Sequence, residues 1–165
     1  MGRWSREELE EAFELYQRVA VEAVNGKGWD HFCDIFTWDC VYVEAQKGMV
    51  GGRDAVKRWY ADLFQIYPVS HMVHYPVEWY IIDEDRGWIC CYFWCRMADP
   101  GDGSIWQTGC YSLLKYAGDM HFKFEEDAYN PAHLDAMLQG WTARHRELHE
   151  QSLAINYPAD LGSPV

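Results

Sequence analysis

The chain has 165 residues, of which 49% are hydrophobic and 16% aromatic, and it carries a formal net charge of −12. This length and apolar content predict one folded domain with a substantial core and exclude a disordered chain. The acidic balance argues against a nucleic-acid partner, because phosphate binding needs clustered Lys and Arg. The sequence also shows no basic face that would bind an anionic membrane surface.

The longest apolar run, "GWICCYFWC", is too short to span a bilayer, and the acidic, amphipathic start "MGRWSREELEE" is unlike a signal peptide. We therefore expect a cytoplasmic protein. The six cysteines show no C-x-x-C pairing, and most of them lie in apolar, strand-like text. They are predicted to be reduced core thiols rather than disulfides or zinc ligands.

The first half of the chain contains three predicted helices and one strand. Ser5 followed by Glu8 forms a capping box, and the apolar residues behind it recur at helical spacing until "NGKG" at 25–28. A short second helix is predicted from Trp29 to Phe36, and "DCVYVEA" (39–45) alternates as a strand. "GGRDAVKRWYADLF" (51–64) predicts the third helix.

The second half is predicted to be strands followed by one helix. Segments near 71–83, 88–98, 104–116 and 120–128 are separated by turn sequences, and Pro76 marks a bulge or an edge in the first of them. Pro131 begins a C-terminal helix. We predict an α+β fold in which helices pack on one face of a curved antiparallel sheet. A single domain is expected over residues 1–150 and a tail over 151–165.

The layout resembles the SnoaL-like, nuclear transport factor 2-like superfamily, with "VYVEAQKGMVGGRDAVKRWYADL" after two helices and "FEEDAYNP" after the last strand. The resemblance spans roughly Glu7 to Arg146. It implies a cystatin-like, cone-shaped roll whose sheet encloses a deep hydrophobic pocket, and a homodimer formed through the sheet. Members include limonene-epoxide hydrolases, ketosteroid isomerases, scytalone dehydratases, polyketide cyclases and diarylpropane lyases, and also non-catalytic binding modules.

Similarity to the limonene-epoxide hydrolase pattern implies catalytic candidates on three strands. Tyr42, Arg96 and Asp127 match its tyrosine, its arginine and its late aspartate. Glu44 stands where that pattern has Asn, and Ala98 stands where it has Asp. Without an acid at position 98, Arg96 is expected to pair with Asp127 or Glu44 and to keep that carboxylate ionised. Asp127 is the candidate base.

Four further ionisable groups are possible site residues. Glu44 lies midway along an apolar strand and is either a desolvated proton shuttle, as similarity to ketosteroid isomerases implies, or a solvated strand-end charge. Glu126 has parity opposite to Asp127 and is expected in solvent. His71 and His74 also differ in parity, so at most one faces inward as a lone acid–base group, and a metal pair is not predicted. His71 is taken as the candidate.

Strand alternation and aromatic content predict the wall of the pocket. The expected inward sets are Trp88, Tyr92, Trp94 and Arg96 on the 88–98 strand, Trp106, Thr108, Cys110 and Ser112 on the 104–116 strand, and His121, Lys123, Glu125 and Asp127 on the last strand. Ligand contacts are expected from Tyr16, Trp38, Trp59, Trp88, Tyr92, Trp94, Trp106 and Cys110. Such a wall suits a flat aromatic ligand, although these residues also suit ordinary core packing. For Tyr16, similarity to the isomerases implies an oxyanion-binding tyrosine.

The chain carries no glycine-rich phosphate loop, P-loop lysine or nucleophile elbow, so acid–base chemistry without a cofactor or metal is expected. We predict a lyase or dehydratase that acts on a hydrophobic aromatic small molecule, such as a lignin-derived diaryl or a polyketide-like phenol. An isomerase, an epoxide hydrolase, a polyketide cyclase and a non-catalytic binding or dimerisation module stay open. An open cavity with acids in its wall favours the enzyme, and a roll filled by its own tryptophans favours the module.

Overall fold

The computed structural model describes residues 3–156, with side chains through residue 150. It confirms the predicted α+β fold. Helix α1 spans Arg6–Glu22, and the Ser5 side chain accepts a 3.1 Å hydrogen bond from the Glu8 backbone N–H, as the capping box predicts. A π-type turn over Ala23–Lys27 ends this helix, with Gly26 at a φ of 106°, and α2 spans Trp29–Cys33.

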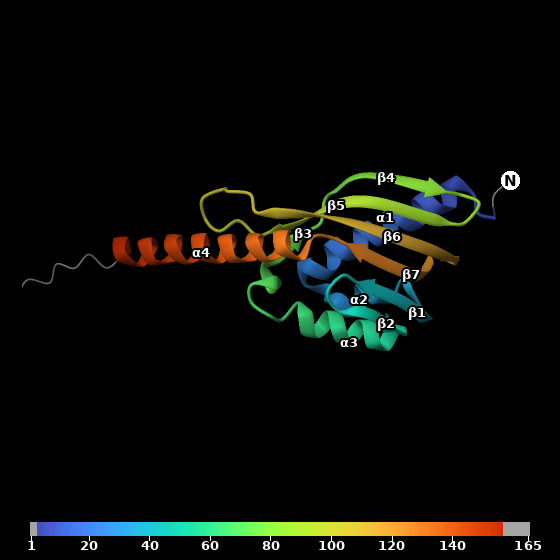
Figure 1. Cartoon of the computed structure of the whole chain (residues 1–165), viewed down its shortest axis with the longest axis horizontal. Coiled ribbons are helices and arrows are strands. Elements are labelled where there is room, and N and C mark those ends of the chain that lie inside the picture. Colours follow the sequence, from blue (N-terminus) through green and yellow to red (C-terminus); the bar gives the residue numbers. More distant parts are fainter. Residues whose placement is uncertain (1–2, 157–165) are drawn as a thin grey trace, which may run out of the picture.

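Within the described residues, seven strands form one curved sheet (Figure 1). The strands span Phe36–Glu44 (β1), Gly48–Gly51 (β2), Met72–His74 (β3), Val77–Asp83 (β4), Trp88–Met97 (β5), Gln107–Gly118 (β6) and His121–Ala128 (β7). Their order is β2-β1-β7-β6-β5-β3, and β4 also pairs with β5. β1 and β7 run parallel, so the sheet is mixed rather than purely antiparallel as predicted.

Pro76 divides the predicted 71–83 strand into β3 and β4. Residues 69–71 form a 3-10 turn, and the strand begins only at Met72. Pro76 has no N–H to donate, but its carbonyl accepts a 3.0 Å hydrogen bond from the Trp94 N–H. β3 therefore pairs with one end of β5 and β4 with the other, and the predicted irregularity at Pro76 is confirmed.

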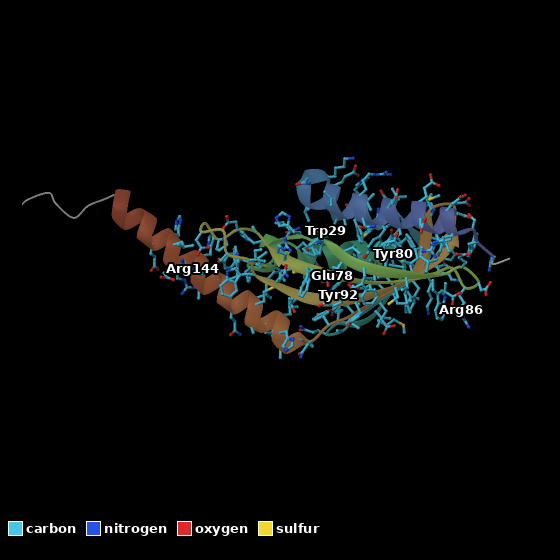
Figure 2. The ribbon with its side chains drawn as sticks, turned by 90° about the horizontal axis from the view of Figure 1, so that it is seen from above. Trp29, Glu78, Tyr80, Arg86, Tyr92 and Arg144 are labelled. Carbon is cyan, nitrogen blue, oxygen red and sulfur yellow. The ribbon has the colours of Figure 1, made fainter. Side chains whose placement is uncertain are left out.

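Helices close the roll around this sheet. α3 spans Arg53–Leu63 and packs beside α2 and β1, while α4 spans Pro131–Asn156 and extends beyond the end of the sheet (Figures 1 and 2). The fully buried Trp141 of α4 donates from Nε1 to the Ala98 carbonyl at 2.7 Å. Residues 151–156 are thus helical, and the rest of the predicted tail lies outside the described residues. No described helix is long and apolar enough to cross a membrane.

The inward face of β5 was predicted wrongly, because the residues between the predicted inward ones are those that face the core. Ile89, Cys91 and Phe93 are buried, whereas Tyr92 lies on the outer face of the sheet. Both faces of β5 carry large apolar side chains, so alternation separates the two sets without showing which set is inside. Gly109 on β6 makes room for the outer set, because a Cβ at this position would lie 1.8 Å from the Tyr92 hydroxyl.

Candidate active site

A cavity of about 460 Å³ lies between the inner face of the sheet, α1, α3 and the first turns of α4. This volume falls within the roughly 300–1,000 Å³ of small-molecule sites in proteins. The predicted hydrophobic pocket is therefore present. Its wall is mainly apolar and includes the aromatic residues Trp29, Trp59, Tyr60, Phe64, Tyr75 and Phe93.

Two carboxyl groups from β7 lie in the cavity wall and are joined by one hydroxyl. Glu125 and Asp127 are two residues apart and so share a face of the strand. Ser112 lies opposite Asp127 on β6, and its hydroxyl reaches Oδ1 of Asp127 and lies 3.3 Å from Oε1 of Glu125. Tyr42 donates to Oδ2 of Asp127 at 2.5 Å, and Tyr16 donates to Oε1 of Glu125 at 2.6 Å.

The second oxygen of Glu125 is the exception in this network. Glu125 is 1% exposed, yet its Oε2 has no hydrogen-bond partner among the described residues. A buried polar atom without a partner is costly, and such atoms are rare in folded proteins. Glu125 lines the cavity, but this oxygen is covered by the wall, so a ligand must displace neighbouring atoms to bond with it.

The two carboxyl groups differ in proton affinity. Burial raises the pKa of Glu125 well above its ordinary value, and the neighbouring charge of Asp127 raises it further. Burial also raises the pKa of Asp127, to about 6, although the hydrogen bonds from Ser112 and Tyr42 act to lower it. As the pH rises, Asp127 therefore gives up its proton before Glu125 does.

Glu44 also lines the cavity, but both of its oxygens are already engaged. Oε2 accepts hydrogen bonds from the backbone N–H groups of Gln46 at 2.9 Å and Lys47 at 2.5 Å. Oε1 accepts one from the Tyr129 hydroxyl. Glu44 is buried, so the solvated alternative does not apply, and these contacts close the turn between β1 and β2. Its charge contributes to the raised pKa of Asp127.

The structure places Arg96 and His71 outside this cavity. Arg96 lies on the outward face of β5, and its Nε donates to Oε1 of Gln107 at 2.7 Å. The predicted pairing of Arg96 with Asp127 or Glu44 is therefore wrong. His71 belongs to the 3-10 turn before β3, and its ring packs 5.0 Å from that of Trp141.

Of the eight predicted ligand contacts, the structure brings Tyr16, Trp59 and Cys110 to the cavity. Trp88, Tyr92 and Trp94 lie elsewhere because they are on the outward face of β5. Trp38 is 78% exposed, since the pairing of β1 with β7 shifts register between Phe36 and Val41. Trp106 packs against Gly140 of α4 and donates from Nε1 to the Ser104 hydroxyl at 3.0 Å.

Sequence reasoning missed the part that Glu125 and Ser112 play. Strand alternation places both on inward faces but gives neither a role. The signal that could have identified the site is that Glu125 is a second carboxylate on the same face of the last strand, two residues before Asp127. The face assignment on β7 needs one correction. Phe122 and Phe124 pair with Tyr116 and Lys115, so Lys123 is an extra, exposed residue at a bulge, and Phe122 is the buried one. As predicted, Glu126 is exposed.

No set of three or more His, Cys, Asp or Glu side chains between residues 3 and 150 is arranged to hold a metal ion. Tyrosines complete the polar part of the site instead. Burial raises the pKa of Tyr16 and of Tyr42 well above the ordinary value, and the nearby carboxylates add to this effect. Both hydroxyls therefore stay protonated and act as hydrogen-bond donors.

No family model matches the sequence, and no curated protein matches it either. Solved structures do match. A candidate SnoaL-like polyketide cyclase from Jannaschia sp. CCS1 is 14% identical, with a TM-score of 0.62 over 80% of this chain and 92% of the other. A hypothetical protein with a ketosteroid isomerase-like fold from Catenulispora acidiphila, crystallised with trimethylamine, is 17% identical, with a TM-score of 0.60 over 75% and 92%.

A third similar structure is the epoxide hydrolase/cyclase-like enzyme of pyran ring formation in the polyether salinomycin. It is 13% identical, with a TM-score of 0.58 over 78% of this chain and 95% of the other. At these identities the likeness concerns the fold and not the reaction. The chain shares the curved α+β roll of these SnoaL-like, nuclear transport factor 2-like and cystatin-like structures.

Proposed function

We propose that the protein is an acid–base lyase of the dehydratase type, which removes water from a hydrophobic aromatic small molecule. The observation that supports this function is the pair of carboxyl groups in the wall of an apolar cavity, where Glu125 is buried, Asp127 is half-buried and both pKa values are raised. An elimination needs a base for the proton and an acid for the leaving hydroxyl, and this pair offers one of each at neutral pH.

In the proposed reaction, Asp127 takes a proton from a carbon of the substrate. The electron pair of that C–H bond forms a carbon–carbon double bond, and the C–O bond to the neighbouring hydroxyl breaks. Neutral Glu125 gives its proton to the departing oxygen, so that water leaves. The protonated Asp127 then returns a proton to Glu125 through the Ser112 hydroxyl, which lies within reach of both carboxyl groups.

The rest of the cavity supports this assignment. Tyr42 and Tyr16 hold the base and the acid in place through hydrogen bonds of 2.5 and 2.6 Å. Trp29 and Trp59 supply flat apolar surface of the kind that stacks on an aromatic ligand. The same wall keeps water away from the carboxyl groups, which strengthens every charge interaction between them and a bound substrate.

Ser112 is the reason to prefer elimination over isomerisation. An isomerase returns the abstracted proton to the same substrate, so it needs one base and no return path. A dehydratase must move a proton from its base to its acid in every cycle, and Ser112 lies between the two. Epoxide hydrolysis and cyclisation stay as alternatives on the same scaffold. A non-catalytic module is disfavoured, because it requires a filled roll with Glu44 and Asp127 directed to solvent.

The test is a turnover screen of aromatic compounds that carry a benzylic hydroxyl, with loss of one water followed by mass spectrometry. Asp127→Asn and Glu125→Gln are each expected to slow turnover by at least about 100-fold. Glu126→Gln makes the same chemical change at the exposed neighbour and is expected to leave turnover unchanged. Ser112→Ala is expected to keep the first turnover and to slow the later ones.

The product decides between the alternatives. A product with the mass of the substrate would identify an isomerase. Wild-type turnover in both Asp127→Asn and Glu125→Gln would refute the proposed proton transfers.

We also propose that the protein forms a homodimer through the outer face of its sheet. Support comes from an aromatic cluster on β4, β5 and β6, in which Trp79 and Tyr111 are 42% and 49% exposed and their rings lie 5.9 Å apart. Exposed apolar surface of this kind indicates a protein interface. Light scattering on purified protein would test it, and a monomer mass would contradict it.

The six free thiols support the cytoplasm as the proposed compartment.

A further inference from the structure

A second cavity, of about 510 Å³, lies beside the first one. It is bounded by the end of α1, the break between β3 and β4, and the loop between β5 and β6. Four residues line both cavities, namely Gln17, Val21, Tyr75 and Val77. The two spaces are therefore neighbours that meet at these four side chains.

The two cavities differ in chemistry because Arg96 lines the second one. Its Nε donates to the neutral side chain of Gln107 at 2.7 Å, and no described carboxylate forms an ion pair with it. His74 lies directly opposite Arg96 on β3 and lines the same cavity.

The one carboxylate in this cavity wall, that of Asp99, is directed to its own loop. Its Oδ1 accepts hydrogen bonds from the backbone N–H groups of Gly101, Asp102 and Gly103, at 2.7, 3.1 and 2.9 Å. Two of these bonds are the main reason that the pKa of Asp99 lies below its ordinary value. The cavity wall therefore holds one negative charge, that of Asp99, which is bonded into its own loop, and one positive charge, that of Arg96, which forms no ion pair with a described carboxylate.

We propose that the second cavity binds a carboxylate on the substrate, with Arg96 as the residue that recognises it. The substrate is then an amphipathic acid whose aromatic part fills the first cavity and whose carboxylate lies at Arg96. This inference rests on the proposed function for the aromatic part only. Arg96 is a specificity-determining residue, since it lies away from Glu125 and Asp127 and reaches the far end of the ligand. The planar guanidinium suits a carboxylate because it can donate two parallel hydrogen bonds.

The experiment compares two probes that differ only in charge, a dansyl-labelled undecanoic acid and its methyl ester. Dansyl fluorescence reports entry into an apolar site, and titration gives a Kd for each probe. Arg96→Gln is expected to weaken binding of the acid by about tenfold or more and to leave binding of the ester within about twofold. Arg96→Lys keeps the charge without the planar fork and is expected to fall between wild type and Arg96→Gln.

Arg86→Gln is the matched control, because Arg86 lies in the turn between β4 and β5, at the far end of the sheet from α4 (Figure 2). It should bind both probes as the wild type does. The inference is overturned if Arg96→Gln leaves the Kd of the acid unchanged, or if it weakens the acid and the ester equally.

Leu138→Trp separates this inference from the proposed function. Leu138 lines only the first cavity of the two, and the larger ring is expected to fill that space and weaken both probes. If Leu138→Trp changes neither Kd, the apolar cavity is not the site and the proposed function fails, whereas a selective effect of Arg96→Gln would still assign the carboxylate to Arg96.

Discussion

The buried carboxyl group of Asp127 predicts that the folded protein loses stability as the pH rises through the mildly acidic range. The pKa of this group is raised from 3.8 to about 6, so the folded state retains a proton that the unfolded chain has already released. Protonation therefore stabilises the fold. Because one pKa unit corresponds to about 1.4 kcal/mol, the full shift is worth about 3 kcal/mol, and ionisation of Asp127 lowers the free energy of unfolding by about 2 kcal/mol between about pH 4 and pH 6.5.

Asp127→Asn removes this titration and keeps the shape of the side chain. We expect urea unfolding to give a free energy of unfolding that falls less with pH in the variant than in the wild type. The difference between the two should change by about 2 kcal/mol between pH 4 and pH 6.5. Glu126→Gln is the control, because this neighbour is exposed and its removal should leave the pH profile of the wild type.

Two results would refute the reasoning. Parallel profiles for the wild type and Asp127→Asn would mean that Asp127 has an ordinary pKa and is not desolvated, so it would not be poised as a base near neutral pH. A wild type that gains stability with rising pH, relative to the variant, would mean that the hydrogen bonds from Tyr42 and Ser112 outweigh the effect of burial on the pKa.

Three more predictions concern packing, the turn beside the site and assembly. Gly109→Ala places a Cβ against the Tyr92 hydroxyl and should lower the free energy of unfolding by about 1–3 kcal/mol in urea, whereas Gly51→Ala, with no atom within 4 Å, should have little effect. Glu44→Ala leaves two backbone N–H groups and a tyrosine hydroxyl without their acceptor, so we expect a loss of about 1–3 kcal/mol and faster amide exchange in the β1–β2 turn. Trp79→Ser should shift the mass seen by light scattering from dimer to monomer without a change in circular dichroism.

Local signals made most of the fold predictable. The capping box at Ser5 and Glu8 and the single apolar face behind it identify α1, because helix starts and amphipathic faces depend on residues close together in the chain. Pro76 indicates the break in its strand for the same reason, since a missing N–H is a property of that residue alone. The parallel pairing of β1 with β7 joins residues about 85 positions apart, and no local pattern specifies it.

The site was less predictable, because it depends on which face of each strand is inside. β1 and β6 have inward sets that alternation identified, and these sets bring Tyr42 to the cavity and Ser112 to the carboxyl groups of Glu125 and Asp127. β5 has apolar side chains on both faces, so the choice rests on how the whole sheet curves around α1. That ambiguity placed Arg96 beside Asp127 in the sequence analysis, whereas the structure places it in the neighbouring cavity.

The unpaired oxygen of Glu125 connects stability to selectivity in this molecule. Its desolvation costs about 1–3 kcal/mol, and no described group of the chain offsets that cost. A ligand oxygen placed against neutral Glu125 accepts its proton in a hydrogen bond and offsets the cost on binding, while a ligand without such an oxygen leaves the group unpaired. Sites of this kind discriminate strongly against a ligand that lacks the hydrogen-bonding group. In the proposed elimination, the ligand oxygen is that of the leaving hydroxyl, and it gains negative charge as the C–O bond breaks. Its hydrogen bond with Glu125, which selects the substrate, therefore becomes stronger in the transition state.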